Sequence, residues 1–269
     1  MRILSLLLLL LTATPVWTPL VWAQGAGTDA AFNGASKGAL GPASPELVLR
    51  ALYGIGPRAN FSHPTLCPRA SCRVKLLAAD VWQAEDGRER MLLVGAAEPR
   101  DAAHAVGAPI GMALLRRESR GWVLELGSPV VDVQGAWGEA PSVGIVLAGG
   151  FGRGVVATPE ISSQGVALTT WSLYVPLGGK FVKVLHLETG QDSLAACERN
   201  DAACRRRADV QDFASIVATE PSAGGGVEVT QQISPATASG PPAETRRWVI
   251  GKDGRVTQTA GRQPQRRDR

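Results

Sequence analysis

A glycine-rich stretch at the centre of the chain limits most strongly what fold the sequence can adopt. Residues 133–157 read VQGAWGEAPSVGIVLAGGFGRGVVA, with seven glycines at positions 135, 138, 144, 149, 150, 152 and 154. Two short runs among them, 143–147 and 155–157, consist mainly of strand-forming residues. Glycine weakens helices and permits tight turns, so this composition predicts bent strands joined by glycine turns.

Short apolar runs on both sides extend the same pattern. The sequence predicts strands at 74–82, 90–96, 111–117, 122–126, 166–175, 181–188 and 227–233, and a last hairpin from 248–250 and 256–258. A short helix should begin after Ser44 and end at Gly54, and 194–218 should be helical in part. We therefore expect a mainly β fold, an antiparallel sandwich or open barrel with one or two short peripheral helices.

The two ends of the chain differ from this body. Residues 1–23 have a basic start, an apolar run and the small-residue motif Val-Trp-Ala before Gln24, the layout of a cleaved signal peptide. A membrane anchor is the alternative, but the apolar run is short and two prolines follow it. Residues 24–43 predict a flexible leader, 44–260 a single β-rich domain, and 261–269 a disordered basic tail. The mature protein is expected to be exported, to the periplasm or the medium, with no membrane span after cleavage.

Export decides how the four cysteines are interpreted. Cys67 and Cys72 form one close pair in the sequence, and Cys197 and Cys204 form another. In an oxidising compartment they predict two disulfides, and local pairing is favoured among the three possible connectivities. A zinc site is the alternative, although the spacings do not match those of common zinc sites. No metal and no cofactor are expected.

The charge of +4 is concentrated at the C-terminal end. Residues 246–269 contain eight Lys or Arg and two Asp, a balance of +6 (8 − 2). This basic segment could hold the protein to an anionic polymer of the cell envelope. It lacks interleaved aromatic residues apart from Trp248, so a nucleic-acid partner is not expected.

Few residues suggest catalysis. Ser142 stands in the sequence APSVG, which resembles a nucleophile elbow, and Glu160 and His186 could complete a triad. Pro141 precedes the serine and a strand follows it, whereas the elbow needs a helix there. The two other histidines, His63 and His104, have no metal-type spacing. The glycines at 150–154 match no nucleotide fingerprint.

One possible binding patch remains. Trp137 lies between two glycines in a predicted loop, and Phe151 and Arg153 follow it in the same stretch. Exposed tryptophan and arginine are common at binding hot spots. The sequence therefore indicates two possible functions: a non-catalytic exported β-domain that binds an envelope protein or polymer, and an exported hydrolase. No catalytic residue can be assigned for the second.

Overall fold

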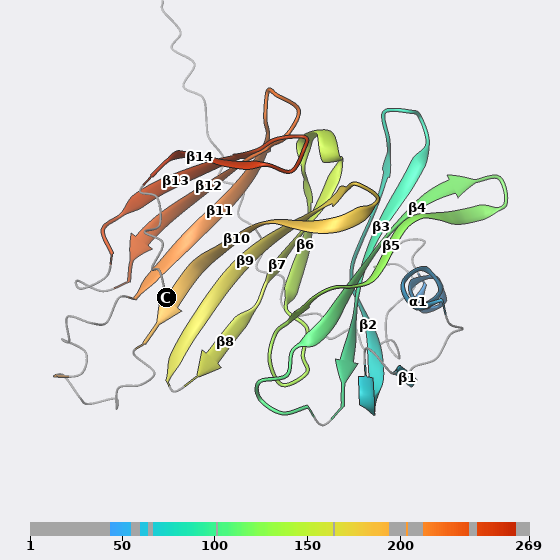
Figure 1. Ribbon diagram of the computed structural model, residues 1–269, viewed down its shortest axis with the longest axis horizontal. Coiled ribbons are helices and arrows are strands. Elements are labelled where there is room, and N and C mark those ends of the chain that lie inside the picture. Colours follow the sequence, from blue (N-terminus) through green and yellow to red (C-terminus); the bar gives the residue numbers. More distant parts are fainter. Residues whose placement is uncertain are drawn as a thin grey trace, which may run out of the picture.

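The computed structural model describes residues 44–54, 60–63, 67–100, 102–163, 165–193, 203, 212–236 and 241–261. These residues form one α-helix and fourteen strands in two antiparallel sheets (Figure 1). Sheet A has the order β1-β2-β3-β4-β5. Its strands are β1 (Asn60–His63), β2 (Cys67–Gln83), β3 (Glu89–Pro99), β4 (Ala108–Glu118) and β5 (Gly121–Gln134). The predicted mainly β fold with a short helix is confirmed.

Sheet B has the order β14-β13-β12-β11-β10-β9-β7-β6, and β8 pairs with β9 beside β7. The strands are β6 (Ser142–Leu147), β7 (Arg153–Thr158), β8 (Glu160–Ser163), β9 (Val166–Leu177), β10 (Lys180–Asp192), β11 (Phe213–Pro221), β12 (Val227–Pro235), β13 (Glu244–Ile250) and β14 (Val256–Ala260). A short 3₁₀ turn, η1 (Gly149–Phe151), joins β6 to β7. The predicted strands all lie within observed ones.

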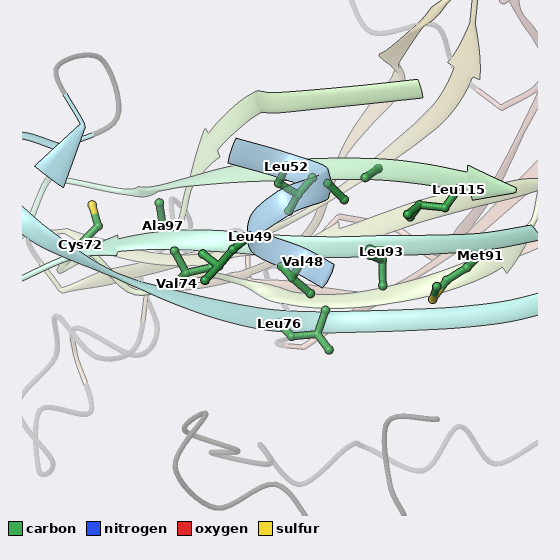
Figure 2. Packing of buried hydrophobic residues seen from close by; sticks show 12 residues of the cluster. Val48, Leu49, Leu52, Cys72, Val74, Leu76, Met91, Leu93, Ala97 and Leu115 are labelled. Atoms are coloured by element: carbon green, nitrogen blue, oxygen red, sulfur yellow. The ribbon is translucent and has the colours of Figure 1, made fainter. Parts of the chain in front are cut away.

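Helix α1 (Pro45–Tyr53) forms for the reasons visible in its sequence. Ser44 caps the N-terminus by accepting a hydrogen bond from the Leu47 N–H at 3.2 Å, and Gly54 ends the helix with φ of 62°. One face of the helix carries Val48 and Leu52, which pack on one side of sheet A (Figure 2). A nine-residue helix is unstable alone, so this packing is what stabilises it.

Three hydrophobic cores separate four layers. The first lies between α1 and sheet A. The second lies between sheet A and the β7–β9–β10 part of sheet B, where Leu92 and Met112 meet Tyr174 and Phe181. The third lies inside sheet B, which folds back on itself so that Trp171 and Leu187 pack with residues of β12 and β13. In Figure 1, β11–β14 and α1 lie at opposite ends of the molecule, with sheet A and β6–β10 between them.

Sheet B folds back where β10 and β11 separate. Only two pairs join these strands, Gly190 with Ala214 and Gln191 with Phe213. Beyond that point, side chains replace the backbone ladder. The Gln231 amide donates to Glu188 O at 2.7 Å and to Ser215 Oγ at 2.9 Å, and Ser215 Oγ donates to Thr189 O at 2.8 Å. A barrel does not close.

The structure corrects two local predictions. Helix was expected in part of 194–218, but the end of that range, from Phe213, belongs to strand β11 (Phe213–Pro221); most of 194–212 lies outside the described residues. Phe213 and Val217 share a face in either structure, because a spacing of four suits both periods. In a regular strand at 122–126, Trp122 and Leu126 would lie on one face, because they are four residues apart. A bulge in β5 instead sends Trp122 to the core under α1 and Leu126 to the core between the sheets.

Two of the four cysteines, Cys197 and Cys204, lie outside the described residues, so the predicted disulfide between them is not tested. No described cysteine is free, and Cys72 is fully buried without a free thiol. In the β1–β2 ladder, Cys72 lies opposite Phe61 and Cys67 lies opposite His63, and these two β1 residues are two positions apart. Two residues span about 6.6 Å of strand, within the Cα separation of about 7 Å that a disulfide tolerates. The register is thus compatible with local pairing, which stays a prediction.

Candidate binding site

The candidate site lies where the chain passes from sheet A to sheet B. Strand β5 ends at Gln134 and β6 begins at Ser142, so residues 135–141 connect the two sheets. Within this turn Trp137 has φ of 56° and is the single non-glycine residue with positive φ in the described part of the chain. A bulky residue in this conformation is strained, and such strain is concentrated at functional sites.

Backbone hydrogen bonds hold the turn against the loop between β3 and β4. The Trp137 N–H donates to His104 O at 3.2 Å, and the Gly138 N–H donates to Val106 O at 2.7 Å. Gly138 lies so close to this loop that a Cβ there would be 2.7 Å from Ala102 Cβ. The backbone of Trp137 is therefore held by two hydrogen bonds, one from its own N–H group and one from the N–H group of the next residue.

His104 supports the indole ring. The two rings meet edge to face, with centroids 4.9 Å apart and an angle of 81° between planes. His104 Nε2 lies 2.8 Å from Ser162 O in β8. Because a carbonyl oxygen only accepts, this nitrogen carries the hydrogen. His104 thereby ties β8 to the Trp137 turn, and a surface position becomes rigid.

The ring is nevertheless open to solvent. Trp137 is 61% exposed, and it is the one aromatic residue among the exposed large hydrophobic residues of the described part of the chain. Val106, whose carbonyl holds Gly138, is 40% exposed. We refer to Trp137, His104 and Val106 as the Trp137 patch. Aromatic residues presented rigidly in this way are typical anchors of protein interfaces.

Phe151 and Arg153 do not join this patch. Phe151 lies in η1 and packs against the core inside sheet B. Arg153 is in β7, where its Nε donates to Asp80 at 2.7 Å and its guanidinium lies 5.4 Å from the centre of the Trp82 ring. Both are at the far end of β6 from Trp137, separated by about 17–20 Å of strand. The three residues therefore lie in different surroundings.

The glycine loop at 149–152 uses its amides internally. The Gly150 N–H donates to Gly225 O at 2.7 Å, in the turn between β11 and β12. The N–H groups of Phe151 and Gly152 donate to Ala148 O and Gly149 O. Strand β7 follows directly, and no helix. The loop therefore closes the core inside sheet B and presents none of these three amides to an anion.

A second polar cluster, the polar seam, joins β5 to β9 and β10. Tyr174 OH and Lys183 Nζ donate to Asp132 Oδ2 at 2.6 Å and 2.9 Å. Gln134 Nε2 lies 2.6 Å from Tyr174 OH and 2.9 Å from Asp132 Oδ2. On the opposite open side of the sandwich, Arg153 and Asp80 make the matching ion pair. Among the described residues, the two sheets are thus joined by an ion pair on each side, Lys183–Asp132 and Arg153–Asp80.

The seam shifts the ionisation of two of its members. Burial alone would raise the pKa of Asp132, but hydrogen bonds from Lys183, Tyr174 and the Val133 N–H together hold it below its ordinary value. Burial, and then the neighbouring Asp132 carboxylate, raise the pKa of the Tyr174 phenol well above its usual range. The carboxylate is therefore ionised and the phenol protonated at neutral pH.

The remaining catalytic candidates are dispersed. His186 Nδ1 lies 2.8 Å from Ser172 Oγ across the β9–β10 pair, a contact that serine chemistry would need. Ser172 is fully buried, so a substrate cannot reach its oxygen in this conformation. Ser142 opens β6 opposite Thr158 and has no helix after it. The side chain of His63 lies outside the described residues.

The described residues contain no group of three or more His, Cys, Asp or Glu side chains placed to hold a metal ion. None of their helices combines the length and apolarity that a membrane crossing needs. No protein-family model, curated protein or solved structure matches the chain.

Proposed function

We propose that the protein is an exported, non-catalytic binding module that holds another protein of the cell envelope through the Trp137 patch. The signal-peptide layout of residues 1–23 supports export. The observation that carries the binding role is the strained, solvent-exposed Trp137, fixed by hydrogen bonds to the β3–β4 loop and supported by His104. An indole held in place loses little entropy when a partner covers it.

The charges near the patch favour a protein partner over an anionic polymer. Glu139 is two residues from Trp137, and Glu160 begins the strand β8 that His104 contacts. Both carboxylates would repel an anion. The basic segment 246–269 suggested a polymer; its last part, residues 262–269, lies outside the described residues, whereas Arg246 in β13 forms an ion pair with Glu244.

The test compares three immobilised proteins: the wild type, Trp137→Ala and Ile216→Ala. Ile216 is 70% exposed on β11, so its variant is a control for general loss of exposed apolar surface. A detergent extract of the envelope is passed over each. We expect a protein that the wild type and Ile216→Ala retain and that Trp137→Ala does not. Removal of a hot-spot tryptophan costs about 2 kcal/mol or more, so affinity for the purified partner should fall about 30-fold.

Equal retention by all three proteins would reject the Trp137 patch as the binding site. A variant lacking residues 262–269 tests the alternative that the basic tail binds an anionic polymer. If its release from the envelope fraction exceeds that of Trp137→Ala, the tail and an anionic polymer account for the association.

A hydrolase is the second candidate, because His186 contacts Ser172. Its test is labelling with a serine-reactive fluorophosphonate, followed by peptide mass analysis. We expect no label on Ser172, since the residue is buried. A label that is lost in both Ser172→Ala and His186→Ala would establish the hydrolase and replace the binding proposal.

A further inference from the structure

Strand β6 forms an edge of sheet B without the features that usually protect an edge. It pairs with β7, and no backbone pairing among the described residues joins its other side. Its sequence, SVGIVL, has neither charge nor proline. The edge strand β5, by contrast, contains Glu125, Pro129 and Asp132. The edge strand β14, VTQTA, also lacks charge and proline, but most of its residues are polar, whereas those of β6 are mainly apolar. Proteins normally shield exposed edges with charges or proline, because free backbone groups there pair with other chains.

A second free edge approaches β6 from sheet A. Strand β1 pairs with β2 only from Cys67 to Arg73, so among the described residues no strand pairs with that side of β2 from Leu76 to Gln83. Between the two edges is a hollow of about 460 Å³, lined by residues 78–80 of β2, 145–147 of β6 and Arg153. A bulge in β2 between Leu76 and Ala78 interrupts its pairing with β3 beside this hollow. We call the hollow and the two strand edges the β2–β6 slot.

The lining of the slot favours an uncharged ligand. Ala78 and Ala79 leave space, and Leu147 is 56% exposed at one end. A Cβ added at Gly144 would meet no atom within 4 Å. The two charged residues of the lining, Asp80 and Arg153, neutralise each other in an ion pair of 2.7 Å. The slot therefore offers apolar side chains beside strand edges that have no backbone partner among the described residues, and the charges in its lining compensate each other.

We propose that the β2–β6 slot binds an extended, uncharged apolar segment of another protein, which adds to sheet B as a strand beside β6. Addition of a strand to a free edge is an established mode of peptide recognition, in which the backbone supplies affinity and pockets select side chains. A second copy of the chain fits less well. A standard interface needs about 20–30 residues from each partner, and β6 offers six. The slot is distinct from the Trp137 patch, so the inference does not depend on that site.

The test uses a fluorescein-labelled decapeptide of alternating valine and threonine, blocked at both ends, and measures anisotropy with the full chain. We expect saturable binding. Leu147→Lys and Gly144→Lys should each weaken it about tenfold or more, since lysine is a common protector of strand edges. Val256→Lys, on the other edge of sheet B, is the matched control and should leave the affinity unchanged. Unfolding midpoints verify that all variants are folded.

Amide hydrogen exchange locates the peptide. Alternate residues of an antiparallel strand direct their N–H groups to opposite sides, so the peptide should slow exchange at every second residue of β6. No saturable binding, or new protection confined to β5 or β14, would overturn the proposal. A concentration-dependent dimer with β6 amides protected in the absence of peptide would also overturn it and assign the edge to a second copy.

Trp137→Ala distinguishes this site from the proposed function. It should leave peptide affinity unchanged while abolishing retention of the envelope protein. Loss of peptide binding in Trp137→Ala would show that the two sites are one. Absence of peptide binding with normal Trp137-dependent retention would reject the slot alone.

Discussion

At the scale of single residues, Trp137 has an unusual balance between stability and function. Its positive φ of 56° costs about 1 kcal/mol, because the Cβ of an L-residue crowds the carbonyl oxygen there. The flanking turn residues Gly135 and Gly138 share positive φ without this cost. A protein selected for stability alone would have glycine at 137 as well.

The strain at Trp137 predicts that a glycine variant is more stable than an alanine variant at this position, the reverse of the usual order. Trp137→Gly should be more stable than Trp137→Ala by about 0.5–1 kcal/mol in urea unfolding, because only alanine retains the strained Cβ. The control is Ala136→Gly, where φ is ordinary and glycine should lower the free energy of unfolding by about 0.5–1 kcal/mol. If Trp137→Gly is the less stable of the pair, the strain is absent in solution.

Sequence alone distinguished Trp137, because a tryptophan between two glycines is conspicuous. It could not separate Trp137 from Phe151 and Arg153, which are near it in the chain. The extended strand β6 lies between them and carries them apart. His104 was noticed as a histidine, but its contact with Trp137 depends on how the β3–β4 loop docks on the turn. Spacing in the sequence does not contain that information.

At the scale of elements, the presence of most strands was predictable from their apolar runs, and their bulges and breaks in pairing were not. The alternation of β9 was visible, with Trp171 and Leu173 on one face and Ser172 and Tyr174 on the other. What the pattern could not show is that both faces are buried, since sheet A covers the second one. The bulge in β5 and the separation of β10 from β11 arise from pairing with other strands, which no local pattern records.

The glycines of residues 133–157 differ in whether the surrounding structure leaves space for a side chain. A methyl group at Gly150 would collide with the carbonyl oxygen of Gly225, whereas one at Gly144 would meet nothing. Neither residue has positive φ, so backbone strain does not complicate the comparison. Gly150→Ala should lower the free energy of unfolding by about 2–3 kcal/mol, and Gly144→Ala should change it by less than about 0.5 kcal/mol. Chemical denaturation measures both, and equal effects would contradict the close packing of η1 on the β11–β12 turn.

At the scale of the whole molecule, the polar seam makes sheet packing sensitive to acid. The pKa of Asp132 is lower in the folded protein than in the unfolded chain, where an aspartate has a value of about 3.9. Its contribution to stability is therefore complete above about pH 5 and is lost as the pH falls through the folded pKa. Tyr174 and Lys183 lose their ionised acceptor when Asp132 is protonated.

Asp132→Asn tests this contribution. At pH 7 the variant should be less stable by about 1–3 kcal/mol, since hydrogen bonds to a charged group are lost or weakened. Its stability should also fall less steeply than that of the wild type between pH 5 and pH 2. Glu220→Gln, at an exposed position on β11, is the control and should change stability by less than about 0.5 kcal/mol. Parallel pH profiles for wild type and Asp132→Asn would contradict the role of the seam.

The passage of the chain from one sheet to the other has a consequence for folding. In the described part of the chain, residues 60–134 supply every strand of sheet A, residues 142–260 supply every strand of sheet B, and no backbone ladder joins the two. In sheet A each strand pairs with its neighbour in sequence, so loop-closure costs are small and the first sheet can form before the second. Sheet B then packs on the face of sheet A that is already formed. The turn at 135–141 connects the two sheets, so the residues around Trp137 reach their final positions only when sheet B has docked.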